Sequence, residues 1–396
     1  MIVKIDKYDD LGNGIAKINN KVCFIKNGME NETVDIQITK EKKNYSEARI
    51  LNIIESNKFR IEPICKYYFN CGGCNFLHMK SEEEKKIKIE RCINYFSKND
   101  GFFATKKYNY RNKINLHVKN GKVGFYKEKS NNLIPINYCY LVDNKINSII
   151  NFFNEYSDFN FNGSILIRVN TKSETMVVIN GKYCYIDKLM SCELINNLVY
   201  NNQVKKGRDY FIEFVKSYRF IVHYQSFFQV NIVGLEKILD LLTEFIKDKK
   251  IDTVLDLYSG TSVLGIHVSK YVNNVTSIEI NSFATYDAIK NIKLNNVNNL
   301  KVINGSVSDY IDNFNNVDLI ILDPVRKGID LKTVEYLKKI SPPYIIYISC
   351  EITSLTRDLE YLKDSYELQK ICMVDMFPNT IHVECVALLS FKILEK

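Results

Sequence analysis

The chain of 396 residues lacks three features, and each absence excludes a class of protein. It has no apolar run near the ~20 residues that a membrane-spanning helix needs, so we expect no membrane partner. Its first ten residues, MIVKIDKYDD, contain no apolar signal core, so we expect a cytoplasmic protein. It also lacks the G-x-G-x-x-G pattern of dinucleotide-binding folds, which argues against a cofactor held through its pyrophosphate.

The composition is that of an ordinary globular protein with two or three domains, with 25% charged and 46% hydrophobic residues. The 54 basic and 46 acidic residues give a net charge of +8, which favours a polyanionic partner without singling one out. The 11 cysteines are an odd number without secretory signs. They therefore predict metal binding, chemistry or core positions rather than a disulfide scaffold.

Three segments differ in their pattern. Residues 1–56 read as short strands with turns at Asn13-Gly14 and Asn19-Asn20, which predicts a small β-barrel. Residues 57–224 are β-rich and include a charged helix predicted over about 81–96; the helical region 81–100 is expected to pack on the catalytic domain. Residues 225–396 alternate helices with continuous apolar strands, which predicts a doubly wound α/β domain.

A cofactor site is predicted where the first two strands of the α/β domain end. The first strand leads into Asp256-Leu257-Tyr258-Ser259-Gly260-Thr261, and small residues there allow a ligand to approach the backbone. The second strand ends at Glu279, about 20 residues along the sequence from the loop, where an acidic residue commonly binds ribose hydroxyls. S-adenosylmethionine has a ribose but no phosphate and fits better than a dinucleotide. A purely structural turn fits the same residues.

Two later strand ends carry groups capable of chemistry. Asp323 follows the strand VDLIIL, and Cys350 follows YIIYI. A cysteine in such a place is by default a core residue. A helix predicted to begin near Thr353 would lower the pKa of the Cys350 thiol through its positive end, which favours a nucleophile. Glu384 stands in the apolar strand VECVALL, where a carboxylate needs a partner or a role.

These motifs together resemble the RNA uridine-5 methyltransferase family of TrmA- and RumA-like enzymes. The matching stretches lie within the last ~170 residues in the family's order: Ser226-Phe227-Phe228-Gln229-Val230-Asn231, DLYSG, SIEIN, LDPVRKG, YISC with TRDL, and DMFPNTIHVE.

The resemblance implies a role for each matching residue. The Cys350 thiolate would add to carbon 6 of uracil, and Glu384 would remove the carbon-5 proton after methylation. The residues that would surround S-adenosylmethionine are Gln229, Tyr258, Glu279 and Asp323, with Gln229 and Asp323 also near the uracil. Arg326 would pair with an RNA phosphate or a carboxylate.

The chain also departs from the family pattern. It has Ser262 and Val263 where relatives have a glycine and a small polar residue, and Ile352 where they usually have proline. These changes predict a divergent member of the family. They bear on cofactor affinity and local geometry rather than on the thiol chemistry.

A cysteine motif precedes the charged helix. Cys65, Cys71 and Cys74 lie in C-x5-C-G-G-C, and Cys139 is the best candidate for a fourth ligand. Four thiolates suit zinc or an iron–sulfur cluster, and spacing does not decide between them. The resemblance implies a 4Fe–4S cluster, which would fix the central domain and help to shape the RNA site.

The resemblance further implies that residues 1–56 are a TRAM domain and that the protein is a monomer that methylates 23S ribosomal RNA. Barrel and cysteines together favour the ribosomal branch over transfer RNA. Aromatic residues Phe102, Phe103, Tyr108 and Tyr110 are candidates for stacking on bases. The alternatives are a transfer-RNA methyltransferase, a non-catalytic RNA-binding or ribosome-assembly protein with the same fold, and an iron–sulfur redox protein.

Overall fold

The computed structural model describes residues 1–127 and 130–392. Residues 393–396, the end of the predicted third domain, lie outside the described residues. The chain divides into two compact units. The first comprises Met1–Ser97, Tyr126–Asn131 and Phe377–Ile381, and the second comprises Lys98–Phe125, Asn132–Met376 and His382–Lys396. The predicted boundaries of three domains stay a prediction.

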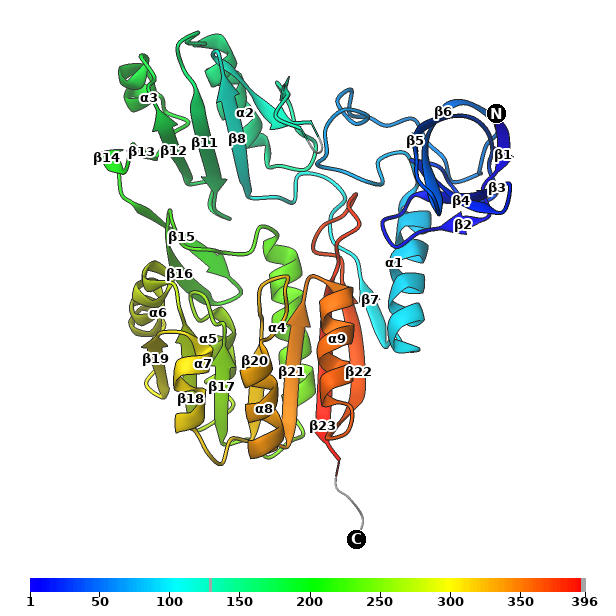
Figure 1. Cartoon of the computed structure of the whole chain (residues 1–396). Coiled ribbons are helices and arrows are strands. Elements are labelled where there is room, and N and C mark those ends of the chain that lie inside the picture. The colour runs from blue at the N-terminus through cyan, green and yellow to red at the C-terminus, as the bar shows by residue number, and fades with distance from the viewer. Residues whose placement is uncertain (128–129, 393–396) are drawn as a thin grey trace. The chain divides into compact units, whose positions relative to one another are not determined.

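The first unit contains the predicted small barrel, seen as a ring of strands in Figure 1. Its strands pair in the order β1-β5-β6-β4-β3-β2, and alternate side chains such as Ile5, Ile25 and Val34 form its core. Asn19 and Asn20 both have positive φ, as a two-residue hairpin turn requires. The strands are β1 (Ile2–Lys4), β2 (Lys7–Tyr8), β3 (Gly14–Ile18), β4 (Lys21–Lys26), β5 (Thr33–Glu41) and β6 (Tyr45–Glu55).

The predicted charged helix is α1 (Ser81–Phe96), and it also belongs to the first unit. Two of its side chains hold the segment Phe377–Ile381 from near the end of the chain. Glu84 accepts a hydrogen bond from the backbone N–H of Asn379 at 2.7 Å, and Lys88 donates to the carbonyl of Phe377 at 3.4 Å. Glu84 and Lys88 also form a buried ion pair at 2.7 Å, so the charges compensate each other.

The second unit begins with the predicted β-rich region. Its sheet has the order β10-β9-β8-β11-β12-β13-β14, and the helix α2 packs against β11. A separate hairpin, β15–β16, follows it. The elements are β8 (Lys113–Lys119), β9 (Lys122–Tyr126), β10 (Leu133–Pro135), α2 (Asn144–Glu155), β11 (Gly163–Val169), β12 (Thr175–Gly181), α3 (Ile186–Ser191), β13 (Asn197–Tyr200), β14 (Gln203–Lys206), β15 (Tyr210–Val215) and β16 (Tyr218–His223).

The predicted doubly wound domain is the rest of the second unit. Strand order is β19-β18-β17-β20-β21-β23-β22-β7, and β17 to β21 are parallel. Near-continuous Val, Ile and Leu in these strands fit burial on both faces. The strands are β7 (Gly101–Phe103), β17 (Thr253–Leu257), β18 (Asn274–Glu279), β19 (Leu300–Asn304), β20 (Leu319–Leu322), β21 (Tyr344–Ser349), β22 (Tyr366–Val374) and β23 (Glu384–Phe391).

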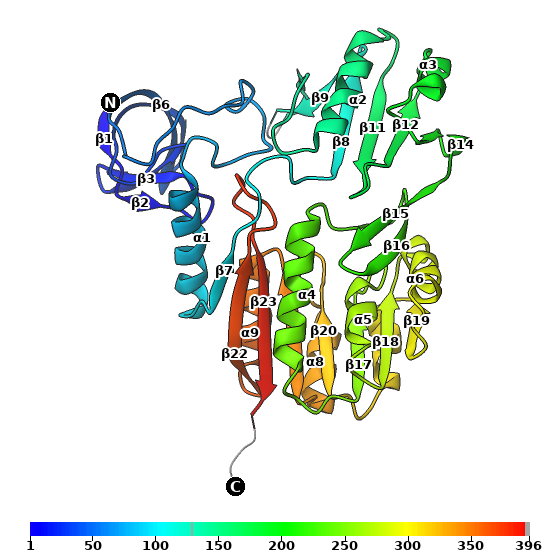
Figure 2. The same cartoon turned by 180° about the vertical axis from the view of Figure 1, so that it is seen from behind.

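Helices cover both faces of this sheet. In Figure 1, α8 and α9 lie in front of the strands, and in Figure 2, seen from behind, α4 lies in front. No helix in the described part of the chain is both long and apolar enough to cross a membrane. The helices are α4 (Ile232–Ile246), α5 (Val263–Val268), α6 (Ser282–Leu294), α7 (Val307–Tyr310), α8 (Leu331–Ile340) and α9 (Ile352–Leu362), with a short 3₁₀ turn at Ile311–Asn313.

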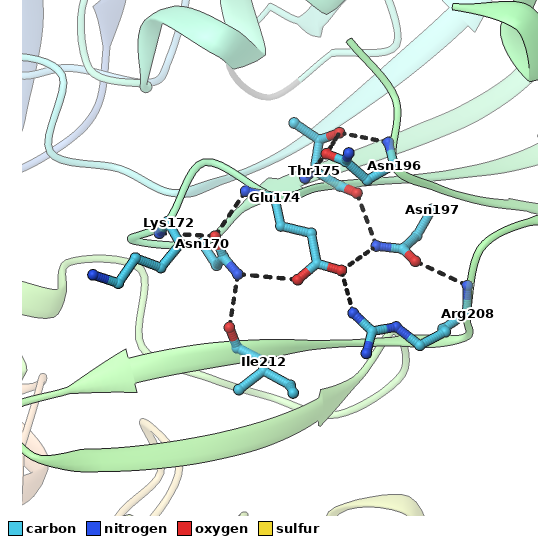
Figure 3. Close-up of polar contacts among 8 residues, drawn as sticks. All are labelled: Asn170, Lys172, Glu174, Thr175, Asn196, Asn197, Arg208 and Ile212. Carbon is cyan, nitrogen blue, oxygen red and sulfur yellow. Dashed lines mark hydrogen bonds and ion pairs between the residues drawn. The ribbon is translucent and has the colours of Figure 1, made fainter. Parts of the chain in front are cut away.

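Polar side chains join the β11–β12 turn to the chain that enters β15, as Figure 3 shows. Glu174 forms an ion pair with Arg208 at 2.6 Å and accepts a hydrogen bond from Asn197 at 2.9 Å. Asn170 donates to the carbonyl of Ile212 at 2.7 Å. The hairpin β15–β16 is therefore tied to the central sheet, and with it the start of the segment that leads to α4.

The side chain of Asn231 helps to hold this segment in place, and a substitution can test its contribution. It is buried, caps α4 by accepting from Gly234 N–H, and donates to Thr105 Oγ1 (2.9 Å) and the Met376 carbonyl (3.0 Å). We predict that Asn231→Ala lowers the free energy of unfolding by about 2–3 kcal/mol in urea denaturation, because a cap and two donor bonds are lost. The control Asn281→Ala removes only a cap, that of α6, and should cost about 1 kcal/mol. Equal losses would contradict this role of Asn231.

Candidate functional site

The carboxyl ends of the parallel strands bring three of the predicted site residues to one edge of the sheet. Leu257 of β17 pairs with Ile278 of β18 and with Leu322 of β20. The residues one step further along these strands are Tyr258, Glu279 and Asp323, which therefore lie in register next to one another. This edge is where open α/β sheets bind their ligands.

Cys350 and Glu384 meet at the same edge through the antiparallel pair β21–β23. The last paired residues are Ser349 and Cys385. Continuing the register by one residue sets Cys350 opposite Glu384, and side chains directly opposite in an antiparallel pair share one face. Glu384 is buried and Cys350 is half-buried. A thiol and a carboxyl group that are far apart in sequence thus become neighbours.

The predicted lowering of the Cys350 pKa is wrong. The pKa of this thiol is raised to about 11, mainly by burial and also by the nearby charges of Glu384 and Asp323, while Arg326 opposes the rise. Helix α9 does begin beside Cys350, but its N-cap residue Glu351 accepts a hydrogen bond from Thr353 N–H and places a negative charge at the helix end. Desolvation and carboxylates therefore outweigh the helix dipole.

The two carboxyl groups of the site are also held toward their neutral forms. The pKa of Glu384 is raised to about 8, mainly by burial and also by Asp323, while Arg326 opposes the rise. Burial likewise raises the pKa of Asp323. Arg326 is exposed and supplies the cation that acts on both Cys350 and Glu384. The sequence carried a signal for it, a basic residue two places after Asp-Pro, but gave it no definite role.

The loop between β17 and α5 is fastened to the end of β18. Glu279 accepts hydrogen bonds from Gly260 N–H at 2.8 Å and from Asn281 N–H at 2.7 Å. Gly260 has φ +54°, and a Cβ atom there would meet nothing within 4 Å. The buried hydroxyl of Ser259 has no hydrogen-bond partner among the described residues. Open space beside an unsatisfied hydroxyl and a carboxylate fits a hydroxyl-bearing ligand such as a nucleoside.

The structure explains how the chain tolerates its departures from the family pattern. Ser262 has φ +60°, a conformation that favours glycine. Its buried hydroxyl donates to Ser277 at 2.6 Å, and Ser277 in turn donates to Asp256, so the serine is satisfied beneath the loop. Ile352 is the first residue of α9, a position that suits proline, and it is instead buried as an apolar contact.

Gln229 lies in a segment whose two ends are bonded to other elements. The carbonyl of Ser226 accepts from Arg168 at 2.7 Å, and the hydroxyl of Ser226 donates to Asp287 at 2.6 Å. The carbonyl of Val230 accepts from Asn112 N–H at 2.9 Å. Gln229 itself is half-buried between these bonds. The side chain of Asn112 also donates to the carbonyl of Gln229 at 3.4 Å, so Asn112 helps to fix the backbone at Gln229.

The aromatic residues proposed for base stacking differ in exposure. Tyr110 is buried, so its ring is not available to an RNA base. Phe102 and Phe103 are half-buried in β7, where they pair with β22, and Lys237 lies 4.0 Å from the ring centroid of Phe103. These residues mainly build the sheet edge.

The predicted metal ligands are half-buried thiols. Cys65, Cys71 and Cys74 lie in a loop of the first unit, where Cys71 N–H donates to the carbonyl of Tyr67 at 2.7 Å. Cys139 lies in the second unit, and the side chain of Asn147 bonds both its N–H and its carbonyl. Among the described residues, no three Cys, His, Asp or Glu side chains are assembled as a metal-binding group. The soft thiol donors nevertheless suit zinc or an iron–sulfur cluster.

Comparison with known proteins bears on what this edge of the sheet does. A family model described as tRNA (Uracil-5-)-methyltransferase matches residues 195–392, and a TRAM domain model matches residues 1–51. An "Uncharacterized RNA methyltransferase" of Clostridium tetani is 31% identical, over 96% of this chain and 94% of its own length. Another, of Staphylococcus aureus, is 29% identical over 96% of both chains.

A solved structure has the same fold over almost the whole chain. The tRNA (uracil-54, C5)-methyltransferase of Pyrococcus abyssi, crystallised in complex with S-adenosyl-L-homocysteine, matches with a TM-score of 0.83. The match covers 98% of this chain and 100% of the other at 21% identity. The family model spans half of the chain and the Clostridium tetani relative nearly all of it. The chain is therefore an RNA methyltransferase with an N-terminal TRAM domain, and it belongs to the tRNA (uracil-5-)-methyltransferase family.

Proposed function

We propose that this enzyme transfers a methyl group from S-adenosylmethionine to carbon 5 of a uridine in 23S ribosomal RNA, through a covalent bond between Cys350 and carbon 6. The observation that carries the proposal is the register that sets the Cys350 thiol opposite the buried Glu384 carboxyl, beside Asp323. Carbon 5 of uracil is too weak a nucleophile to be methylated directly, so a thiol and an acid–base group are the chemistry it needs.

The first step activates the pyrimidine. The thiolate of Cys350 forms a bond to carbon 6, and the electrons of the 5,6 double bond move toward carbonyl oxygen 4 as an enolate. Carbon 5 becomes nucleophilic. When bound, S-adenosylmethionine supplies the electrophilic methyl group that carbon 5 takes. Tyr258, Glu279, Asp323 and Gln229 are proposed to hold this cofactor.

The second step restores the double bond between carbons 5 and 6. Glu384 as carboxylate accepts the remaining carbon-5 proton, the bond between sulfur and carbon 6 breaks, and its electrons return to Cys350 as thiolate. The products are 5-methyluridine, the demethylated cofactor and one proton. Arg326 is exposed beside both groups and counters their negative charge, which favours the thiolate and the carboxylate that these steps use.

The cysteines are proposed to hold a 4Fe–4S cluster. Cys65, Cys71, Cys74 and Cys139 are half-buried and offer only thiol donors, which iron–sulfur clusters prefer. Because the methyl transfer has no redox step, we assign the cluster a structural role. In that role it fixes the cysteine loop and helps to shape the surface that receives RNA.

Transfer RNA is the second candidate substrate. The case for ribosomal RNA rests on the barrel and the cysteines together. The Pyrococcus abyssi protein, named for uridine 54 of transfer RNA, matches this chain over 98% of its length, which includes most of the barrel. The barrel therefore does not separate the two substrates. Methyl transfer to unmodified 23S and transfer-RNA transcripts, followed by mapping of 5-methyluridine, decides between them.

Labelled methyl groups test the chemistry itself. We predict that the parent enzyme methylates one of the two transcripts at carbon 5 of uridine, and that Cys350→Ala lowers the rate by at least about 10⁴-fold because no enolate forms. Glu384→Gln should bind covalently to the same RNA and remain attached on a denaturing gel, since the carbon-5 proton has no acceptor. The double variant Cys350→Ala/Glu384→Gln is the control and should give no adduct. An adduct in the double variant, or full activity of Cys350→Ala, would refute the covalent mechanism.

The raised pKa of Glu384 predicts a pH dependence of stability. A carboxyl group whose folded pKa lies above its unfolded value stabilises the fold fully below the unfolded value of 4.5, and that stability is lost as pH rises through about 8. From pH 6 to pH 9 the free energy of unfolding of the parent should therefore fall by roughly 1–3 kcal/mol more than that of Glu384→Gln. Urea denaturation of both proteins at the two pH values measures the difference; parallel changes would show that Glu384 does not carry this penalty.

Iron analysis tests the cysteine assignment independently of activity. Protein purified without oxygen should contain about four iron atoms and four acid-labile sulfides per chain, as the proposed cluster requires. Cys71→Ser should lose most of both. Cys184→Ser is the control, because Cys184 is an exposed cysteine outside the proposed set, and it should retain them. Stoichiometric zinc without sulfide would exclude the cluster.

A further inference from the structure

A row of rings runs along α6 and the neighbouring hairpin β15–β16, exposed on the helix and half-buried on the hairpin. Phe283 and Tyr286, three residues apart on α6, are 43% and 59% exposed. The ring of His223, at the end of β16, stacks on Phe283 with centroids 4.7 Å apart and planes within 3°. Residues three apart lie on the same face of a helix, so Phe283 and Tyr286 form a continuous surface with His223.

One lysine lies among these rings. The Lys290 ammonium lies 4.1 Å from the ring centroid of Tyr286 and 5.6 Å from that of Tyr210, which begins β15. Among the residues that the structure describes, Lys290 forms no ion pair. Its charge is thus held over two rings without a carboxylate in direct contact, and it remains available to an anion.

The acidic residues of these elements are turned inward. The carboxylates of α6 and of the two hairpin strands are Asp287 and Glu213, both buried. Asp287 accepts hydrogen bonds from His223 N–H and the Ser226 hydroxyl. Asp209, just before β15, lies 3.6 Å from His223 Nε2 at the margin of this face. The exposed side of α6 therefore presents rings and lysines without a carboxylate of its own, which suits a polyanion that also has flat apolar groups.

The row adjoins the segment that carries Gln229, because Asp287 of α6 accepts hydrogen bonds from both His223 N–H and the Ser226 hydroxyl. Phe283 follows Glu279 closely in the chain, and His223 precedes Gln229 along a segment whose position is fixed by hydrogen bonds. We therefore expect the nucleotides next to a uridine in the site to meet these rings.

We propose that the face formed by Tyr210, His223, Phe283, Tyr286 and Lys290 binds a single-stranded segment of the RNA substrate adjacent to the target uridine. The inference rests on the proposed function, since it takes RNA as the substrate. Proteins bind single-stranded RNA by stacking bases on aromatic rings and by placing cations near the phosphates, and both elements are present here. A protein partner would instead be expected to meet an apolar face with paired charges at its rim.

The test measures RNA binding apart from catalysis. The probe is a labelled oligouridylate of about twelve nucleotides, within the length that such surfaces occupy, and affinity is read from fluorescence anisotropy without cofactor. Tyr286→Ala and Phe283→Ala should each weaken binding about tenfold, and Lys290→Glu should also reduce the dependence of binding on salt.

A matched control lies outside the proposed face. Tyr271 is 42% exposed, has Lys270 at 4.8 Å from its ring centroid, and stands between α5 and the start of β18. Tyr271→Ala should bind oligouridylate as the parent does. The same variant can be assayed with the unmodified transcript that the parent enzyme methylates. Tyr286→Ala should then raise KM with kcat nearly unchanged, because the ring binds RNA without touching the reacting atoms.

The outcomes separate this inference from the proposed function. Equal affinities of Tyr286→Ala, Phe283→Ala and the parent, or an equal loss in Tyr271→Ala, overturn the docking face even if the parent methylates RNA. A parent that binds no oligouridylate overturns it too. A parent that binds oligouridylate through this face but transfers no methyl group to either transcript supports the docking face while refuting the proposed function.

Discussion

The antiparallel pairing of β21 with β23 is the constraint on which the rest of the site depends. The strands β17 to β21 are parallel, so this edge of the sheet collects only their carboxyl ends until β23 enters from the opposite direction. Its first residue, Glu384, then stands opposite Cys350. If β23 ran parallel to β21, its first residue, Glu384, would lie at the opposite edge of the sheet. The Cys350 thiol would then have no acid facing it.

That pairing has an electrostatic consequence. Burial raises the pKa values of Cys350, Glu384 and Asp323, so the site favours the neutral forms of these groups. Such a site costs less to fold than one with three buried anions. The negative forms needed for reaction then depend on what enters the site and on the nearby cation of Arg326. The predicted route to a reactive thiol, a helix end, is opposed here by the carboxylate of Glu351 that caps the helix.

In the loops around the sheet, hydrogen bonds from polar side chains hold the irregular backbone in place. Arg168, Asn112 and Asn231 each bond backbone atoms of the stretch that carries Gln229 or of its neighbour at Met376. Glu279 does the same for the loop at Gly260. Since loops gain little from apolar burial, these bonds supply the positional order that a reaction centre needs.

The sequence by itself determined the class of fold and the residue types of the site. Apolar runs without alternation indicated buried parallel strands, and Asp323, Cys350 and Glu279 were recognisable because each stands where such a strand ends. It also marked Ser262 and Ile352 as departures from the family pattern. It did not show that the Ser262 hydroxyl finds a hydrogen-bond partner in Ser277, or that Ile352 is accommodated by burial. Only the tertiary structure decided that Cys350 faces Glu384 and that its pKa rises rather than falls. Strand register and desolvation arise from contacts between residues far apart in the chain, and the local sequence pattern does not specify those contacts.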